Sequence, residues 1–144
     1  MTSRPDEPAG AQKWEIRVSL DIYHFPGTLE ELTRRMGVAP DQSLAAGEPI
    51  AGGRKVRAYD RWVIDAGTDH EAPLQEQLRI LLGRVLPLAP RLSALPPPTS
   101  VMISCGVLDY TRDVSLHFDP EVIAAAASMN ASLDVDYYDM SPKE

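Results

Sequence analysis

Residues 13–22 read KWEIRVSLDI, and their pattern decides the fold class. Apolar side chains occupy every second position from Trp14 to Ile22, and charged or polar side chains occupy the positions between them. Because side chains of a β-strand alternate between the two faces of a sheet, we predict a strand with one buried and one wet face. The fragment Val-Ser-Leu of this stretch recurs at residues 114–116, again before a predicted helix. The two copies favour a sheet with helices on one side.

Three helices are predicted from capping residues and apolar spacing. Thr28 should cap the first helix, and Gly37 should end it. Thr68 or Asp69 should cap the second helix, and Asp119 the third. The second helix has apolar residues at helical spacing, namely Leu74, Leu78, Leu81, Leu82 and Val85.

Four further strands are predicted at residues 55–65, 101–107, 114–118 and 133–137. The strands at 101–107 and 114–118 should form an antiparallel hairpin with a tight turn at Tyr110 and Thr111. Matching their apolar faces predicts the pairs Ile103–Phe118, Cys105–Leu116 and Val107–Val114. In that register Cys105 points into the core, whereas His117 lies opposite Ser104 on the far face.

The predicted element order is β-α-β-α-β-β-α-β, which indicates an α+β fold. We expect a mostly antiparallel sheet of about five strands with helices packed on one face. The last six elements have the ferredoxin-like βαββαβ order. A chain of 144 residues corresponds to one domain. We expect a flexible tail over residues 1–12, a single domain over residues 13–140 and a C-terminal tail over residues 141–144.

The charge balance restricts the classes of partner. Fourteen Lys and Arg residues stand against twenty-one Asp and Glu residues, which gives a net charge of −7. Most of this excess lies in residues 105–144, whose only cations are Arg112 and Lys143. Such a chain is a poor non-specific binder of nucleic acid and would suit a cationic protein better. Acidity alone can also serve solubility.

The single cysteine and the hydropathy pattern indicate a compartment. Cys105 cannot form an internal disulfide, so an oxidising compartment is not indicated. The first residues contain no apolar run typical of a signal peptide, and no stretch approaches the length needed to span a bilayer. We therefore expect a cytoplasmic protein that does not bind membranes.

Several short motifs resemble those of a known family. They are Met36-Gly37 with Pro40, Gly47-Glu48, Trp62-Val63-Ile64 and Asp134-Val135-Asp136-Tyr137-Tyr138. With these motifs, residues 13–138 resemble the bacterial family known as domain of unknown function 4279. The resemblance implies an α+β fold, and it brings no agreed activity, cofactor or catalytic residue.

Two groups of residues could carry chemistry, and each has a structural interpretation beside the functional one. Cys105 and His117 could form a nucleophile and its base, but the predicted register separates them, and a buried lone cysteine usually acts as a small apolar residue. Asp134, Asp136 and Asp139 offer oxygen ligands suited to Mg²⁺ or Mn²⁺, but they equally fit a solvated strand face. We assign no catalytic residue, no metal site and no cofactor.

The chain has one basic patch with aromatic residues beside it. Its cations are Arg54, Lys55, Arg57 and Arg61, and Tyr59 and Trp62 lie among them. Such a pattern can bind single-stranded nucleic acid. Because Trp62 falls among the alternate residues that should face the core, we favour a structural role in which the basic patch balances the negative charge of the last strand.

These observations favour a small acidic, non-enzymatic module that binds a protein partner. An immunity or antitoxin protein that neutralises a basic toxin is one specific form of this hypothesis. The candidate binding surface is the uncovered sheet face, with Arg17, Arg57, Arg61, His117, Asp134 and Asp136. The alternative is a metal-assisted hydrolase or small-ligand-binding enzyme that uses the acidic end of the sheet. A homo-oligomer built by edge-strand pairing is a third possibility, and the sequence leaves the oligomeric state open.

Overall fold

Five strands form one mixed sheet in the computed structural model, which describes residues 12–50 and 53–143. The expected N-terminal tail lies outside the described residues except for Gln12, as does Glu144. The strands are β1 (Trp14–Tyr23), β2 (Gln42–Leu44), β3 (Arg61–Asp65), β4 (Ser100–Asp109) and β5 (Ala131–Asp139). Their order is β2-β3-β1-β4-β5, and only the β4–β5 pair is parallel. The predicted α+β class with a mostly antiparallel five-stranded sheet is confirmed.

β1 lies at the centre of this sheet, with β3 on one side and β4 on the other. The predicted alternation is confirmed, because Ile16, Val18, Leu20 and Ile22 are all buried in the core. On β4, Val101, Ile103, Cys105 and Val107 are buried in the same cluster. The longest strand pairing of the sheet, β1 with β4, therefore joins segments far apart in the sequence.

The helices are α1 (Leu29–Met36), α2 (Leu74–Val85), α3 (Ala89–Ser93) and α4 (Pro120–Ser128), with a short 3₁₀ turn at Leu86–Leu88. α1 has the predicted ends. The amide of Glu31 donates to Thr28 Oγ1 at 3.1 Å, and Gly37 ends the helix with φ 76°. A glycine suits this left-handed position because other residues pay a steric penalty there.

α2 begins later than predicted. Its N-cap position is Pro73 rather than Thr68 or Asp69. The Asp69 carboxylate instead accepts a hydrogen bond from the Glu71 amide at 3.0 Å, in a turn before the helix. The predicted apolar stripe is confirmed, since Leu74, Leu78, Leu81, Leu82 and Val85 are all buried. Asp119 is the N-cap residue of α4, as predicted, although its side chain makes no capping hydrogen bond.

The predicted hairpin at residues 101–118 is wrong. Residues 110–119 form a loop without strand pairing, so the pairs Ile103–Phe118, Cys105–Leu116 and Val107–Val114 do not form. β4 has β1 and β5 as its two neighbours, which leaves no free edge for a third strand. The ferredoxin-like order, which needs that hairpin, is not confirmed.

The predicted strand at residues 55–65 is shorter than expected. β3 begins at Arg61, and Val56 makes only an isolated bridge to Pro49. Val56 is 57% exposed, so its alternation with Ala58 does not reflect burial. The fifth strand of the sheet is instead the short β2, which pairs with β3 at the edge.

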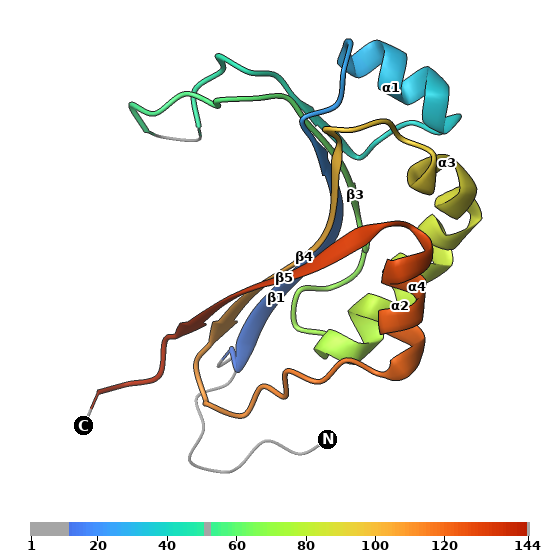
Figure 1. Ribbon diagram of the computed structural model, residues 1–144. Coiled ribbons are helices and arrows are strands. Elements are labelled where there is room, and N and C mark those ends of the chain that lie inside the picture. The colour runs from blue at the N-terminus through green and yellow to red at the C-terminus, as the bar shows by residue number, and fades with distance from the viewer. Residues whose placement is uncertain (1–11, 51–52, 144) are drawn as a thin grey trace.

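All four helices cover one face of the sheet (Figure 1). The sheet bends so that its other face is concave and free of helices, as the ribbon shows. The loop between β2 and β3 extends beyond one end of this concave face, and the ends of β4 and β5 extend beyond the other (Figure 1). Within the described residues, no helix combines the length and apolar character of a membrane span.

Candidate functional site

The concave face of the sheet, which we call the open face, carries the side chains that alternate with the core. Strand register and burial assign to it Glu15, Arg17, Ser19, Asp21 and Tyr23 of β1, Arg61, Val63 and Asp65 of β3, Met102, Ser104, Gly106 and Leu108 of β4, and Ser132, Asp134, Asp136 and Tyr138 of β5. Opposed residues of neighbouring strands share a face. The arginines of this face lie on β1 and β3 beside acidic residues of the same strands, whereas β5 contributes aspartates without a basic residue.

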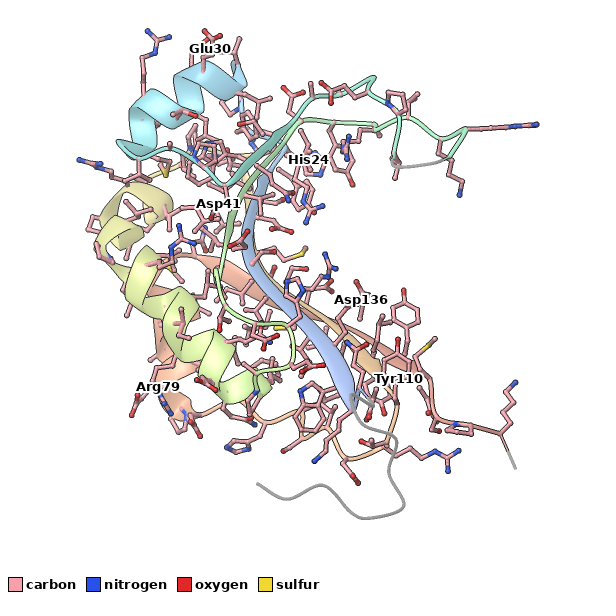
Figure 2. The ribbon with its side chains drawn as sticks, turned by 180° about the vertical axis from the view of Figure 1, so that it is seen from behind. His24, Glu30, Asp41, Arg79, Tyr110 and Asp136 are labelled. Carbon is pink, nitrogen blue, oxygen red and sulfur yellow. The ribbon has the colours of Figure 1, made fainter. Side chains whose placement is uncertain are left out.

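Four of the six residues nominated from the sequence lie on the open face. Arg17 and Asp136 share one row across the sheet, and Gly106 lies between them. Asp134 lies in the next row, and Arg61 is on β3. Figure 2 shows Asp136 on the concave side of the ribbon.

The other two nominated residues lie elsewhere. Arg57 belongs to the loop before β3, where its guanidinium lies 3.9 Å from a carboxylate oxygen of Glu48. His117 belongs to the exposed 110–119 loop, and its Nε2 lies 3.0 Å from Asp119 Oδ1. The structure therefore does not bring Arg57 and His117 together with the face residues.

A partly buried ion pair joins β1 and β3 on the open face. Arg61 Nη2 donates to Asp21 Oδ2 at 2.8 Å, and the Asp21 side chain is only 1% exposed. Ser19 Oγ donates to the same carboxylate at 2.8 Å. Because a buried carboxylate needs partners for its lone pairs, this network fixes the position of Arg61.

Aromatic rings extend the network toward one end of the face. The Tyr23 ring meets the Tyr59 ring edge-on, with 5.4 Å between centroids, and the Arg61 guanidinium lies 5.8 Å from the Tyr23 centroid. The His24 ring lies 4.4 Å from that of Tyr59. These contacts attach the β2–β3 loop to the end of β1.

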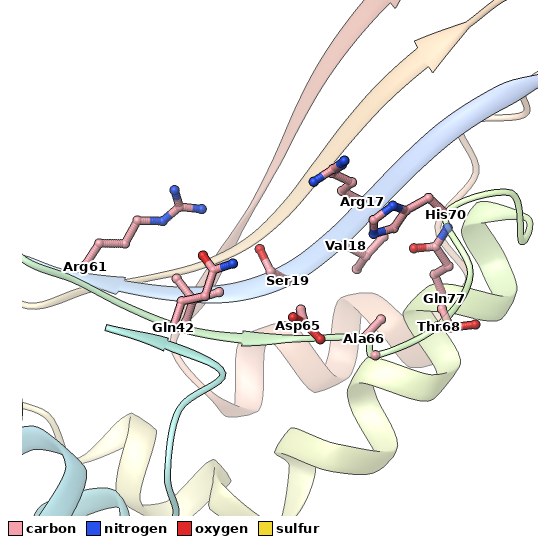
Figure 3. A pocket seen from close by; sticks show the side chains of 12 residues that line it. Arg17, Val18, Ser19, Gln42, Arg61, Asp65, Ala66, Thr68, His70 and Gln77 are labelled. Carbon is pink, nitrogen blue, oxygen red and sulfur yellow. The ribbon is translucent and has the colours of Figure 1, made fainter. Parts of the chain in front are cut away.

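A cavity of about 430 Å³ opens beside β1 and β3. Its lining includes Arg17, Arg61 and His70, together with Asp65 and the amide of Gln77. Figure 3 shows the guanidinium groups of Arg17 and Arg61 on the same side of the sheet, with Ser19 between them and His70 near Arg17. The cavity is at the basic side of the open face, whereas the sequence-based alternative placed ligand chemistry at the acidic end.

Cys105 and His117 do not form a catalytic pair. Cys105 is 1% exposed and belongs to the core, and burial, with a smaller effect of the Asp134 charge, raises the pKa of its thiol to about 12. A thiol with that pKa is not a nucleophile near neutral pH. Cys105 points into the core as predicted, whereas His117 lies in the exposed 110–119 loop and not opposite Ser104, because the predicted hairpin does not form.

The three acidic residues nominated on β5 do not lie on one face of the sheet. Asp134 and Asp136 lie on the open face, whereas Asp139 has the opposite parity and pairs with Arg112 at 3.3 Å. Across residues 12–50 and 53–143, no group of three or more His, Cys, Asp or Glu side chains gathers at metal-binding distance.

Asp109 is a buried carboxylate with a structural role. Its Oδ1 accepts the amides of Thr111 at 3.0 Å and Arg112 at 2.8 Å, and its Oδ2 accepts the amide of Val114 at 3.2 Å and the hydroxyl of Tyr137 at 2.8 Å. Burial alone would raise the pKa of Asp109, but these hydrogen bonds outweigh burial and hold the pKa below its usual value. The carboxylate thereby ties the start of the 110–119 loop to the end of β5.

The sequence profile described as Domain of unknown function (DUF4279) matches residues 14–140. The chain belongs to the DUF4279 family. The match runs from the first residue of β1 to just beyond β5, so it includes every strand and helix described above. No curated protein and no solved structure matches the chain.

Sequence reasoning missed three residues of this DUF4279 domain that build the site. Asp21 has the parity of the exposed face, and its burial depends on contacts across strands that a linear pattern does not contain. Gln77 did carry a signal, since it is a polar residue at helical spacing within the apolar stripe of α2. His70 lies in the segment before α2, where the local sequence predicts only a helix start.

Proposed function

We propose that this DUF4279 domain is a cytoplasmic, non-enzymatic module that binds a basic partner protein on its open face. A large sheet face without helices is the observation that carries the proposal (Figure 1). The core on the other face is complete without it, because the helices bury the apolar side chains there. The open face is therefore available for a partner.

The charge of β5 favours a basic partner. Asp134 and Asp136 point from the same side of this edge strand, and in the part of the chain that the structure describes neither takes part in an ion pair. Like charges close together on one strand face repel each other, and a cationic partner would relieve that repulsion. The net charge of −7 would also accelerate the approach of such a partner.

Apolar side chains on the same face can supply contact area. Met102 and Leu108 of β4 are half-buried, and Tyr138 of β5 is 56% exposed. Tyrosine is enriched at the energetically important centres of protein interfaces. A partner that covers β4 and β5 would bury these side chains together with the two aspartates.

The experiment is capture followed by quantitative binding. The full chain is immobilised and exposed to a lysate of its native host at low salt. The protein that it retains is then purified and titrated with the full chain by calorimetry. We expect a stoichiometric complex whose affinity falls by about tenfold or more in the double variant Asp134→Asn/Asp136→Asn. The affinity should also fall as salt is added, because exposed charges are screened.

The matched control removes two charges from the helical side. Glu30→Gln/Glu76→Gln changes exposed residues of α1 and α2 and leaves the open face intact. This double variant should bind like the wild type. Equal affinity in the two double variants, or no stoichiometric partner at low salt, would contradict the proposal. If the partner is a toxin, the wild type but not the Asp134/Asp136 variant should rescue growth, as expected for an immunity or antitoxin protein.

A further inference from the structure

The cavity beside β1 exists because the β1–β3 ladder is interrupted. Ala66 donates its amide to the Val18 carbonyl at 3.0 Å, as regular pairing requires. The next amide of β1 on that side, from Ile16, donates to the His70 carbonyl at 2.8 Å rather than to Thr68. Residues 67–69 therefore leave the ladder and open a space beside Arg17.

A buried side chain from α2 completes the interrupted ladder. Gln77 Nε2 donates to the carbonyl of Ile16 at 2.9 Å and to that of Ala72 at 2.9 Å. Gln77 is 1% exposed, and it also lines the cavity. Because this amide takes the place of a strand donor, the opening is held by the fold and does not need a ligand to form. A preformed site loses less conformational entropy on binding.

The dimensions suit a small molecule. The cavity volume of about 430 Å³ lies within the range usual for metabolite and cofactor sites. Its rim and walls combine polar side chains with the apolar side chain of Val63. Such a mixture binds the body of a small molecule and orients its polar groups.

The charges of the cavity favour an anion. The Arg17 side chain is 66% exposed, and within the described residues its ion pair is with Glu15 of its own strand, at 3.3 Å. Arg61 uses one terminal nitrogen for Asp21, while its Nε is buried without a hydrogen-bond partner in the described structure. The acid in the lining, Asp65, lies 3.6 Å from the guanidinium of Arg84, which it shares with Asp41.

We propose that this cavity binds a small molecule through a carboxylate or phosphate group held by Arg17, Arg61 and His70. Guanidinium groups form paired hydrogen bonds with both kinds of oxyanion. Arg17 and Arg61 both line this cavity, and Figure 3 shows them on the same side of the sheet with Ser19 between them. Arg17, Arg61 and His70 bring basic side chains together in this lining, although the chain as a whole carries a net charge of −7.

Titration of the full chain with inorganic phosphate and, separately, with succinate at constant ionic strength tests this site. Binding is followed by NMR of the backbone amides of residues 66–70 and of the arginine Nε–H groups. We expect saturable shifts at these positions with at least one probe. The phosphate and succinate arms show which oxyanion is preferred.

Two variants locate the binding. Arg17→Gln should weaken the affinity about fivefold or more, because it removes a charged donor without disturbing the core. Arg79→Gln, on the outer side of α2 (Figure 2), should leave the affinity unchanged. Absence of saturation with both probes, shifts confined to other parts of the chain, or equal affinity of Arg17→Gln and wild type would overturn the proposal. None of these measurements involves Asp134 or Asp136, so the outcome is independent of the partner-binding test.

Discussion

Asp109 illustrates at the scale of a single residue how a buried charge organises a loop. The carboxylate accepts three backbone amides and one tyrosine hydroxyl, so the 110–119 loop begins from a fixed point rather than from a strand pairing. Tyr137, which donates this hydroxyl, has a raised pKa because of its hydrogen bond to Asp109. Removing the charge should therefore affect stability more than most single substitutions do.

We predict that Asp109→Asn lowers the free energy of unfolding at pH 7 by about 2–4 kcal/mol, because an amide cannot accept all of these donors. The pKa of Asp109 is lower in the folded than in the unfolded chain, so its stabilising contribution is full above the unfolded value. That contribution disappears as the pH falls below about 4 and through the lowered folded value. The difference in the free energy of unfolding between Asp109→Asn and the wild type should therefore become smaller at acidic pH. Urea unfolding across this pH range measures it.

The control for that prediction is Asp113→Asn in the same loop. Asp113 is exposed, so its substitution should change stability by no more than about 0.5 kcal/mol at any pH. If Asp109→Asn were as stable as this control at pH 7, the role assigned to the buried carboxylate would be wrong.

Cys105 yields a prediction about reactivity. Its pKa of about 12 and its 1% exposure mean that the native thiol should not react with a thiol reagent at pH 8 on the timescale of minutes. The same reagent should label one thiol per chain once urea unfolds the protein. Rapid stoichiometric labelling of the native protein would show that the core opens near β4.

The alternation of side chains along a strand predicted the position of some site residues and not of others. Arg17 and Arg61 were correctly placed because they lie within or at the start of regular strands, where alternation fixes the face. His117 was misplaced because it lies in a loop, where alternation has no such meaning. Asp21 lies on the open face, as the alternation predicts, but its side chain is buried rather than exposed because Arg61 of β3 covers it.

At the scale of elements, the 110–119 loop explains the largest error. Val114 and Phe118 pack against the core from an extended loop, so their spacing reflects partial burial without strand pairing. A sequence pattern cannot separate these two cases, because both place alternate side chains inward. The true partners of β4 are β1 and β5, one distant in sequence and the other reached through α4.

Two glycines give opposite predictions for the same substitution. Gly37 has φ 76° at the end of α1, and an added Cβ would contact the guanidinium of Arg91. Gly37→Ala should therefore cost about 1–2 kcal/mol. Gly83 lies within α2 with open space around the added Cβ, so Gly83→Ala should stabilise the fold by about 0.5–1 kcal/mol. Thermal unfolding of both variants compares them, and a shift of equal sign would contradict the assignment of Gly37 as a helix-ending residue.

At the scale of the whole molecule, the sheet is held from its centre. β1 is paired on both sides, and β4 is paired with β1 over ten residues and with β5 over nine. β2 has three residues and lies at an edge. Stability should therefore fall from the centre of the sheet to the β2 edge.

We predict that amide hydrogen exchange follows this gradient. The slowest amides should be those of β1 and β4 that face each other, because their exchange requires nearly global unfolding. The amides of β2 should exchange fastest among the strands, since local opening is sufficient. NMR-detected exchange of the native protein measures both. Comparable protection of β2 and β1 would mean that the edge is stabilised by contacts not described above.

Fold class could be predicted at this scale because the burial pattern of the long strands and helices is regular. The topology could not, because strand order depends on which segments meet in space. The open face followed from the alternation in KWEIRVSLDI, whereas the cavity depends on residues 67–69 leaving the ladder. That interruption has no counterpart in hydrophobic periodicity.

The pairing of Trp14 with Asp109 has a consequence for synthesis of the protein. A ribosome makes β1 early and β4 late, so the middle of the sheet cannot close until most of the chain has left the exit tunnel. Native contacts between such distant segments also form slowly. During translation the apolar side of β1 lacks its β4 partner, and exposed apolar surface of this kind favours aggregation.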